Sequence, residues 1–258
     1  MRFDELDRRL RVFETAHDHC VLPGLYMVAR LDGRGFTRLT RERHAFEAPF
    51  DARFRDFMIA TTEHLMDCGF RVVYGYTQSD EISLVLHRDD YTFRRKSRKL
   101  HSVLAGEASG KFSLLLGDLA SFDCRISQLP DLVTLVDYLA WRAEDAHRNA
   151  LNAHCYWSLR KLGELEAGAA ARLQQLAVAD RHELLFQTAG VNFNDLPAWQ
   201  KRGSGLYWEN HAREAVDPRT GEAVLAWRRR LRVDLDLPSG PAYREFVEAL
   251  IEREHQPG

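Results

Sequence analysis

The sequence has few cysteines, no long apolar run and no excess of charge of one sign. Cys20, Cys68, Cys124 and Cys155 lie far apart without a CxxC pair, which argues against a disulfide framework and against a cysteine-based zinc site. No apolar stretch approaches the ~18–20 residues of a membrane span, and the charged N-terminus is unlike a signal peptide. We therefore expect a cytoplasmic protein with no membrane segment.

The charge balance restricts how this chain can bind a polyanion. Its 258 residues include 36 Lys and Arg against 38 Asp and Glu, which gives a net charge of −2. Binding to nucleic acid would depend on a local basic patch, because the overall charge does not attract phosphate. Hydrophobic residues at 45% and charged residues at 29% are an ordinary composition for a folded globular protein.

Strand-like and helix-like segments alternate in the first half of the chain. Apolar, β-prone runs occur at 25–31, 70–76, 82–87 and 120–126. Helical periodicity occurs at 50–68, where Asp51 is a candidate cap, and from Asp89 to about Leu116. The order β-α-β-β-α-β is that of a ferredoxin-like sheet. The sequence therefore predicts an α+β fold.

The second half predicts additional helices and a C-terminal β-hairpin. Helical patterns occur at 131–162 (with a break), 167–177 and 180–188, and strand patterns at 206–213 and 223–237 flank a turn at 217–221. A further amphipathic helix is expected at 3–16. We expect one chain, 1–258, with a sheet core at 1–130 and a helical and hairpin extension at 131–258.

Three carboxylates occur where strands end or turn. Asp32 follows the first strand, and Asp80 and Glu81 lie between the two strands of the predicted hairpin. Because the first strand of such a sheet pairs with the hairpin, all three can meet, although adjacent Asp80 and Glu81 share a site only at a turn. Like charges at ~4 Å repel by ~1–4 kcal/mol, which a divalent cation relieves. Alternatively, the three carboxylates form no site: Asp32 is an ordinary turn residue, and Asp80 and Glu81 form a solvated hairpin tip.

Four ordered motifs resemble those of the tRNA-histidine guanylyltransferases and their guanylyltransferase-like relatives. They are Arg30–Phe36, Gln78–Ser83, Asp137–Asn152 and Asp180–Phe186. The resemblance spans about Phe13 to Trp208. It implies a catalytic domain similar to the palm of polymerases and a nucleotidyltransferase that adds nucleotides to tRNA 5′ ends in the 3′→5′ direction. It also implies a homotetramer, arranged as a dimer of dimers.

The resemblance also implies roles for individual residues. Asp32 and Asp80 would hold two Mg²⁺ ions, Gly33 would lend a carbonyl ligand, and Glu81 would support this catalytic site. The residues that would bind the nucleotide and its triphosphate are Arg30, Gly33, Arg34, Gly35, Phe36, Ser79, Lys99, Arg125, His147, Asn149 and Arg181.

Two departures from the eukaryotic pattern bear on the substrate. Those enzymes carry a lysine before a proline where this chain has Ala48, and the segment Arg148–Asn152 resembles the bacterial and archaeal guanylyltransferase-like branch. That branch implies template-dependent repair of 5′-truncated tRNA with GTP, ATP and other NTPs. The alternative is a histidine-tRNA guanylyltransferase that adds one untemplated G.

Basic segments are candidates for tRNA contact. Residues 94–99 hold five cations in six positions, and 200–205 form a basic, glycine-containing loop. Beside a metal–phosphate site, such cations would contact phosphate. The predicted tRNA-binding residues are Arg94, Arg95, Lys96, Lys201 and Arg202. A solvated helix face and an ordinary loop are the structural alternatives. A palm-type nucleotide cyclase and a non-catalytic RNA-binding protein are the competing functions.

Overall fold

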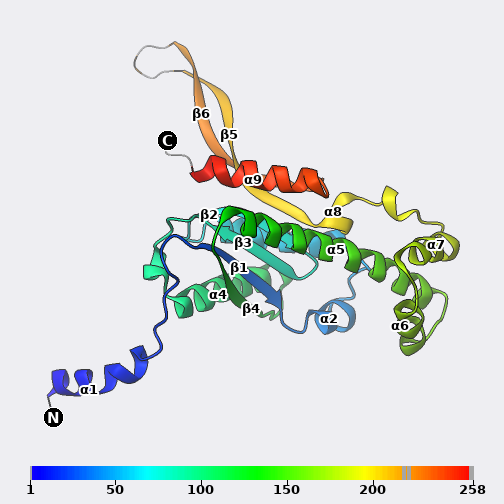
Figure 1. The fold of residues 1–258 in the computed structure, drawn as a ribbon, viewed down its shortest axis with the longest axis horizontal. Coiled ribbons are helices and arrows are strands. Elements are labelled where there is room, and N and C mark those ends of the chain that lie inside the picture. The colour runs from blue at the N-terminus through cyan, green and yellow to red at the C-terminus, as the bar shows by residue number, and fades with distance from the viewer. Residues whose placement is uncertain (1, 217–218, 220–221, 256–258) are drawn as a thin grey trace.

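A single antiparallel sheet with helices on both faces forms the body of the protein (Figure 1). The computed structural model describes residues 2–216, 219 and 222–255. Among these residues the sheet has six strands in the order β4-β1-β3-β2-β5-β6, and each neighbouring pair is antiparallel. The strands are β1 (Tyr26–Gly33), β2 (Val72–Gln78), β3 (Glu81–Leu86), β4 (Phe122–Leu129), β5 (Ser204–Val216) and β6 (Ala223–Asp234).

The predicted β-α-β-β-α-β core is confirmed in the first half of the chain. α3 (Ala52–Met66) connects β1 to β2, and α4 (Ser97–Leu116) connects β3 to β4. β1 lies between β3 and β4, so the first strand pairs with the hairpin as expected. Asp51 begins α3 as predicted, because its side chain accepts a hydrogen bond from the Arg53 amide.

Alternating side chains give the sheet two apolar faces, and each is covered by helices. Met27 and Leu31 of β1 are buried in one core cluster with residues of α3 and α4. Val28 belongs to a second cluster, which includes residues of α5 (Leu132–Lys161) and α9 (Pro241–His255). Elements from both halves of the chain therefore build one sheet and its covering layers.

α5 is one continuous helix of 30 residues, so the break expected within 131–162 is wrong. The helix contains no Gly or Pro, and Asp131 accepts a hydrogen bond from the Thr134 amide at its first turn. Its second half extends past the sheet and packs against three shorter helices (Figure 1). These are α6 (Glu166–Gln174), α7 (Val178–Ala189) and α8 (Ala198–Arg202).

The start of α4 differs from the prediction. The helix begins at Ser97 rather than near Asp89. The Asp90 carboxylate accepts hydrogen bonds from the amides of Arg71 and Thr92, so it joins the loop to the neighbouring chain segment rather than capping a helix. A local helix signal is therefore overridden by a tertiary contact.

The remaining elements are short or lie at the chain ends. α1 (Phe3–Thr15) forms as expected but has no buried residue and lies apart from the sheet (Figure 1). α9 was not predicted, and the predicted turn at 217–221 lies outside the described residues except Arg219.

None of the helices in the described part of the chain has the length and apolarity that a membrane span requires. The short segments are α2 (Phe36–Arg38), the π-helical turn η1 (Leu39–Arg43), and the 3₁₀ turns η2 (Thr92–Arg95) and η3 (Phe193–Asp195).

His154 gives the helical part of the molecule a predicted pH dependence. Its ring lies on α5, with centroids 5.3 Å from Phe50 and 6.1 Å from Phe193, and burial lowers its pKa from 6.5 to about 4. The unfolded chain binds the proton more readily, so stability is expected to fall as pH decreases from 6.5 to about 4. We expect the Tm of the wild type, relative to that of His154→Leu, to decrease as the pH falls from 6.5 to about 4. A pH-independent difference would contradict the assignment.

Candidate active site

Three carboxylates meet at one end of the sheet, as the sequence predicts. Asp32 of β1 is the register partner of Glu81 of β3, and Asp80 lies in the turn between β2 and β3. The Gly33 amide donates a hydrogen bond to the Asp80 carbonyl at 3.0 Å. A Cβ at Gly33 would lie 2.5 Å from the Phe36 ring, so only glycine lets the backbone pack this closely against that ring.

Glu81 is neutralised within the chain. Arg142 of α5 donates two hydrogen bonds to its carboxylate, at 2.9 and 3.0 Å, and the Arg30 Nε lies 3.1 Å from Glu81 Oε1. Arg142 also pairs with Asp145 at 3.0 Å. Glu81 and Arg142 are 8% and 3% exposed, and burial raises the pKa of Glu81 although both arginines oppose this. Glu81 therefore joins the sheet to α5 through a buried ion pair.

Asp32 and Asp80 differ from Glu81 in having no cationic partner. Among the described residues, no Lys or Arg forms an ion pair with either carboxylate, and Ser79 Oγ donates to Asp80 Oδ1 at 3.1 Å. Burial raises the pKa of Asp80, and the charge of Asp32 raises it further. Two uncompensated carboxylates are a donor set that suits Mg²⁺, and the backbone of Gly33, whose amide donates to the Asp80 carbonyl, can add a carbonyl ligand. These three residues are the ones that would hold such an ion.

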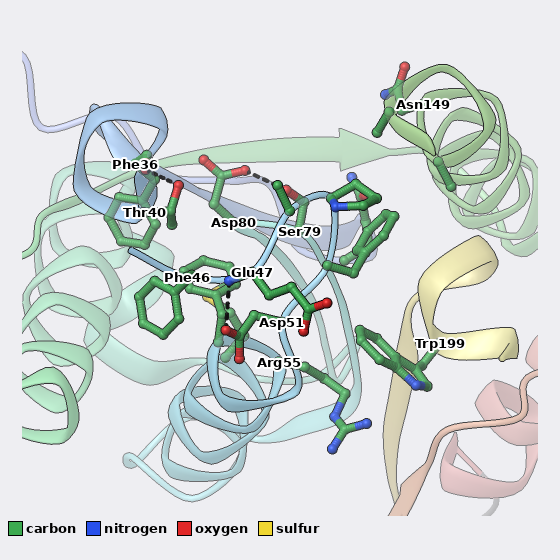
Figure 2. Close-up of a pocket in the computed structure, with 18 of the residues that line it drawn as sticks. Phe36, Thr40, Phe46, Glu47, Asp51, Arg55, Ser79, Asp80, Asn149 and Trp199 are labelled. Carbon is green, nitrogen blue, oxygen red and sulfur yellow. Dashed lines mark hydrogen bonds between the residues drawn. The ribbon is translucent and has the colours of Figure 1, made fainter. Parts of the chain in front are cut away.

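A cavity of about 250 Å³ opens beside Asp80, close to the lower end of the ~300–1,000 Å³ range of ligand pockets. Figure 2 shows Asp80 and Ser79 on one wall and Trp199 of α8 across from them. The apolar lining of the cavity includes Phe46, Phe50 and Phe54. Helix α5 contributes Asn149, Ala153 and Trp157 to the same lining. Both halves of the chain thus form the walls of one pocket.

Three of the eleven predicted nucleotide-binding residues line this pocket. Phe36, Ser79 and Asn149 line it directly, and the Asn149 amide donates to Asp145 Oδ2 at 3.2 Å. Gly35 has a φ of 71° and begins α2, which requires the left-handed conformation that glycine favours. Arg34 is exposed, and its amide donates to the Ser121 carbonyl.

The other eight predicted nucleotide-binding residues do not line the pocket; they are Arg30, Gly33, Arg34, Gly35, Lys99, Arg125, His147 and Arg181. Arg125 of β4 is exposed and is the register partner of Arg30. His147 is exposed on α5, with its ring 5.2 Å from Phe193. Arg181 of α7 donates to the Leu173 carbonyl at 2.9 Å, which directs its side chain toward α6.

The basic run at 94–99 lies at the opposite end of the sheet from Asp32. The prediction that it lies beside the carboxylates is therefore wrong. β3 leads away from Glu81, and the next segment therefore begins at the far end of the sheet. There Arg95, 2% exposed, donates to the Leu25 carbonyl just before β1.

Most cations of this run have partners of their own. Lys96 and Arg98 pair with Asp18, and the Lys99 ammonium lies 5.6 Å from the centroid of the Phe93 ring. Arg94 is exposed. The run is therefore mostly engaged in packing.

The predicted tRNA-binding residues of the 200–205 loop also have structural contacts. Lys201 is buried, and its ammonium donates to the Asn194 carbonyl. Arg202 donates to the Leu237 carbonyl at 2.8 Å and lies 3.5 Å from Asp236. The Arg202 contacts fix α8 against the segment that precedes α9, and the Lys201 contact fixes α8 against residues 193–195.

Sequence reasoning assigned no role to Arg142 and Asp145, although both lie inside a recognised motif. The signal was present: Arg142 occurs among the apolar positions of α5, between Leu139 and Ala146. A charged residue on the buried face of a helix indicates a buried ionic partner.

Comparison with known proteins identifies the family. Residues 7–130 match the family model of tRNAHis guanylyltransferase, and residues 133–233 match the model of the Thg1 C terminal domain. The chain belongs to the tRNA(His) guanylyltransferase family. A probable tRNA(His) guanylyltransferase of Drosophila melanogaster is 31% identical over 90% of this chain and 81% of its own length. The Neurospora crassa enzyme is 34% identical over 78% of this chain and 71% of its own.

Solved structures of this family share the fold. A bacterial Thg1-like protein in complex with ATP superposes with a TM-score of 0.75 at 26% identity, covering 95% of this chain and 98% of its own. The Saccharomyces cerevisiae tRNA(His) guanylyltransferase gives a TM-score of 0.71 at 26% identity, over 87% of this chain and 96% of its own. Members of the tRNA(His) guanylyltransferase family are nucleotidyltransferases that act on tRNA. This chain is therefore an enzyme, and the non-catalytic RNA-binding alternative is set aside.

The buried Glu81–Arg142 pair generates a stability prediction. Arg142→Met leaves the buried Glu81 carboxylate with only Arg30, and breaking such a pair costs about 3–5 kcal/mol of unfolding free energy. Urea denaturation should show that loss, and the double variant with Glu81→Leu should recover much of it. Arg148→Met, at an exposed position of the same helix, is the matched control. Equal stability of Arg142→Met and Arg148→Met would contradict the assignment.

Proposed function

We propose that this chain is a Mg²⁺-dependent 3′→5′ nucleotidyltransferase that repairs 5′-truncated tRNA under the direction of the opposite strand. The observation that supports it is the pair of uncompensated carboxylates, Asp32 and Asp80, of which Asp80 lines a pocket of about 250 Å³. Glu81, beside them, is neutralised by arginines and acts in positioning. The homotetramer and the cytoplasmic location stay predictions.

In the proposed reaction, the 3′-hydroxyl oxygen of the incoming NTP forms a bond to the activated 5′-phosphorus of tRNA. The bond to the leaving pyrophosphate or AMP breaks, and the hydroxyl proton is released. Bound Mg²⁺ would lower the pKa of that hydroxyl and neutralise the leaving group. Asp32, Asp80 and the Gly33 carbonyl would hold the ions. Asn149 and Ser79, on the pocket wall, would orient the nucleotide by hydrogen bonds.

The templated subtype is supported by the pocket wall. Ala48 lines the pocket, and its methyl group supplies no charge where the eukaryotic relatives are expected to carry lysine. Watson–Crick pairing to a template base would position the incoming NTP in compensation. Structures of a bacterial Thg1-like protein with ATP and with GTP, each 26% identical to this chain, accord with use of both nucleotides. The second candidate is untemplated G addition, because the curated relatives are described as tRNA(His) guanylyltransferases.

Removing either uncompensated carboxylate should abolish activity without harming the fold. Asp32→Asn and Asp80→Asn each remove a metal ligand and relieve like-charge repulsion, so the metal-free protein should be as stable as the wild type or more stable. We expect nucleotide addition to fall by at least about 100-fold. Asp123→Asn is the matched control, because Asp123 is the exposed register partner of Asp32 on β4. Near-wild-type turnover of Asp32→Asn or Asp80→Asn with Mg²⁺ present would refute the metal assignment.

The two subtypes make opposite predictions for substrate preference. With Ala48 in the pocket wall, we expect a higher kcat/KM for a 5′-truncated tRNA with a templating base than for untemplated G addition to full-length histidine tRNA. Both substrates are compared at saturating NTP in a gel assay with labelled tRNA. Faster untemplated addition would make the protein a histidine-tRNA guanylyltransferase proper.

A further inference from the structure

Arg41 lines the pocket but lies outside the four family motifs. It lies in the π-helical turn η1, where the His44 amide donates to the Leu39 carbonyl at 3.1 Å and the Phe46 amide to the Thr40 carbonyl at 2.9 Å. π-helical turns insert a residue into a helix and occur frequently at functional sites. This turn forms one wall of the pocket, through Thr40 and Arg41.

The Arg41 guanidinium is held by an aromatic ring and by no charge. Its Cζ lies 4.7 Å from the centroid of Trp157 on α5. Among the described residues, it forms no ion pair and no side-chain hydrogen bond, so its donors remain available. Arg55 of α3, which also lines the pocket, differs, because it lies 4.6 Å from Trp199 but also pairs with Asp56.

The position of Arg41 against Trp157 suits contact with the nucleoside part of a bound nucleotide. The triphosphate must lie near Asp32 and Asp80, where the proposed metal ions would neutralise it. Asn149 lines the pocket with Asp80, and Trp157 follows eight residues later on α5, or about 12 Å at 1.5 Å per residue. If the phosphates lie near Asp32 and Asp80, a base that extends along α5 toward Trp157 would meet the guanidinium stacked on that ring.

We propose that Arg41 is a specificity-determining residue that donates to the purine base of the bound nucleoside triphosphate and favours guanine over adenine. An arginine offers paired donors and no acceptor, and guanine presents two acceptors, O6 and N7, on one edge. Adenine presents N7 beside an amino group, which cannot accept from the second donor. The N7 edge is the one left free when a base pairs with a template, so this contact is compatible with templated addition. The inference rests on the proposed nucleotide site.

The test is equilibrium binding of nucleotides without tRNA, measured by calorimetry with GTP, ATP and 7-deaza-GTP, which lacks the N7 acceptor. We expect the wild type to bind GTP about ten-fold more tightly than 7-deaza-GTP. In Arg41→Ala, that difference should disappear, and ATP affinity should change little. Arg41→Lys keeps the charge but not the paired donors, so it should recover at most part of the preference. Arg38→Ala, in the same segment but not in the pocket lining, should match the wild type.

The outcomes separate this inference from the proposed function. If the wild type binds the nucleotides and Arg41→Ala retains the preference for GTP, the role of Arg41 is wrong and the nucleotide site stands. If Arg41→Ala weakens all three nucleotides equally, Arg41 contacts phosphate and the base-specific role is again wrong. If the wild type binds none of them, the proposed nucleotide site itself fails.

Discussion

The buried ion pair between Glu81 and Arg142 is the contact on which the rest of the site depends. Three carboxylates at one end of a sheet repel one another, and the chain removes one of the three charges with two arginines. The same pair fixes α5 against the sheet next to the hairpin turn. Since α5 is unbroken beyond this point, it carries Asn149 and Trp157 to the pocket that the β2–β3 hairpin also lines. One interaction thus sets both the charge of the site and its shape.

The pairing of β2 with β5 is the second constraint, because it joins segments that match two separate family models. Gly203 has a φ of 74°, and a Cβ there would lie 2.5 Å from the Thr77 carbonyl oxygen. The turn after α8 can therefore pack directly against the hairpin, which brings Trp199 to the pocket. Neither segment alone would enclose the cavity.

The sequence predicted most of the core, since strand alternation and the position of Asp32 before two glycines are local signals. The misplaced Lys99 shows what local patterns omit: a crossover helix starts where the preceding strand ends, and β3 ends far from Glu81. The start of α4 and the role of Asp90 were not predictable, because amides of a neighbouring segment decide them. The pocket wall depends on a π-helical turn, for which the residue pattern gives no recognised signal.

The contacts of the arginines determine which of them can bind a polyanion in this protein, whose net charge is −2. Arg95, Arg142 and Arg202 donate to carbonyls or carboxylates of the chain itself, and their donors are not available to phosphate. Arg34, Arg94 and Arg148 are exposed, and within the described residues they form no ion pair. Affinity for tRNA therefore depends on where the unpartnered cations lie, because only these can release counterions from the nucleic acid on binding. Counting basic residues along the sequence overestimates that number, since burial and pairing are properties of the fold.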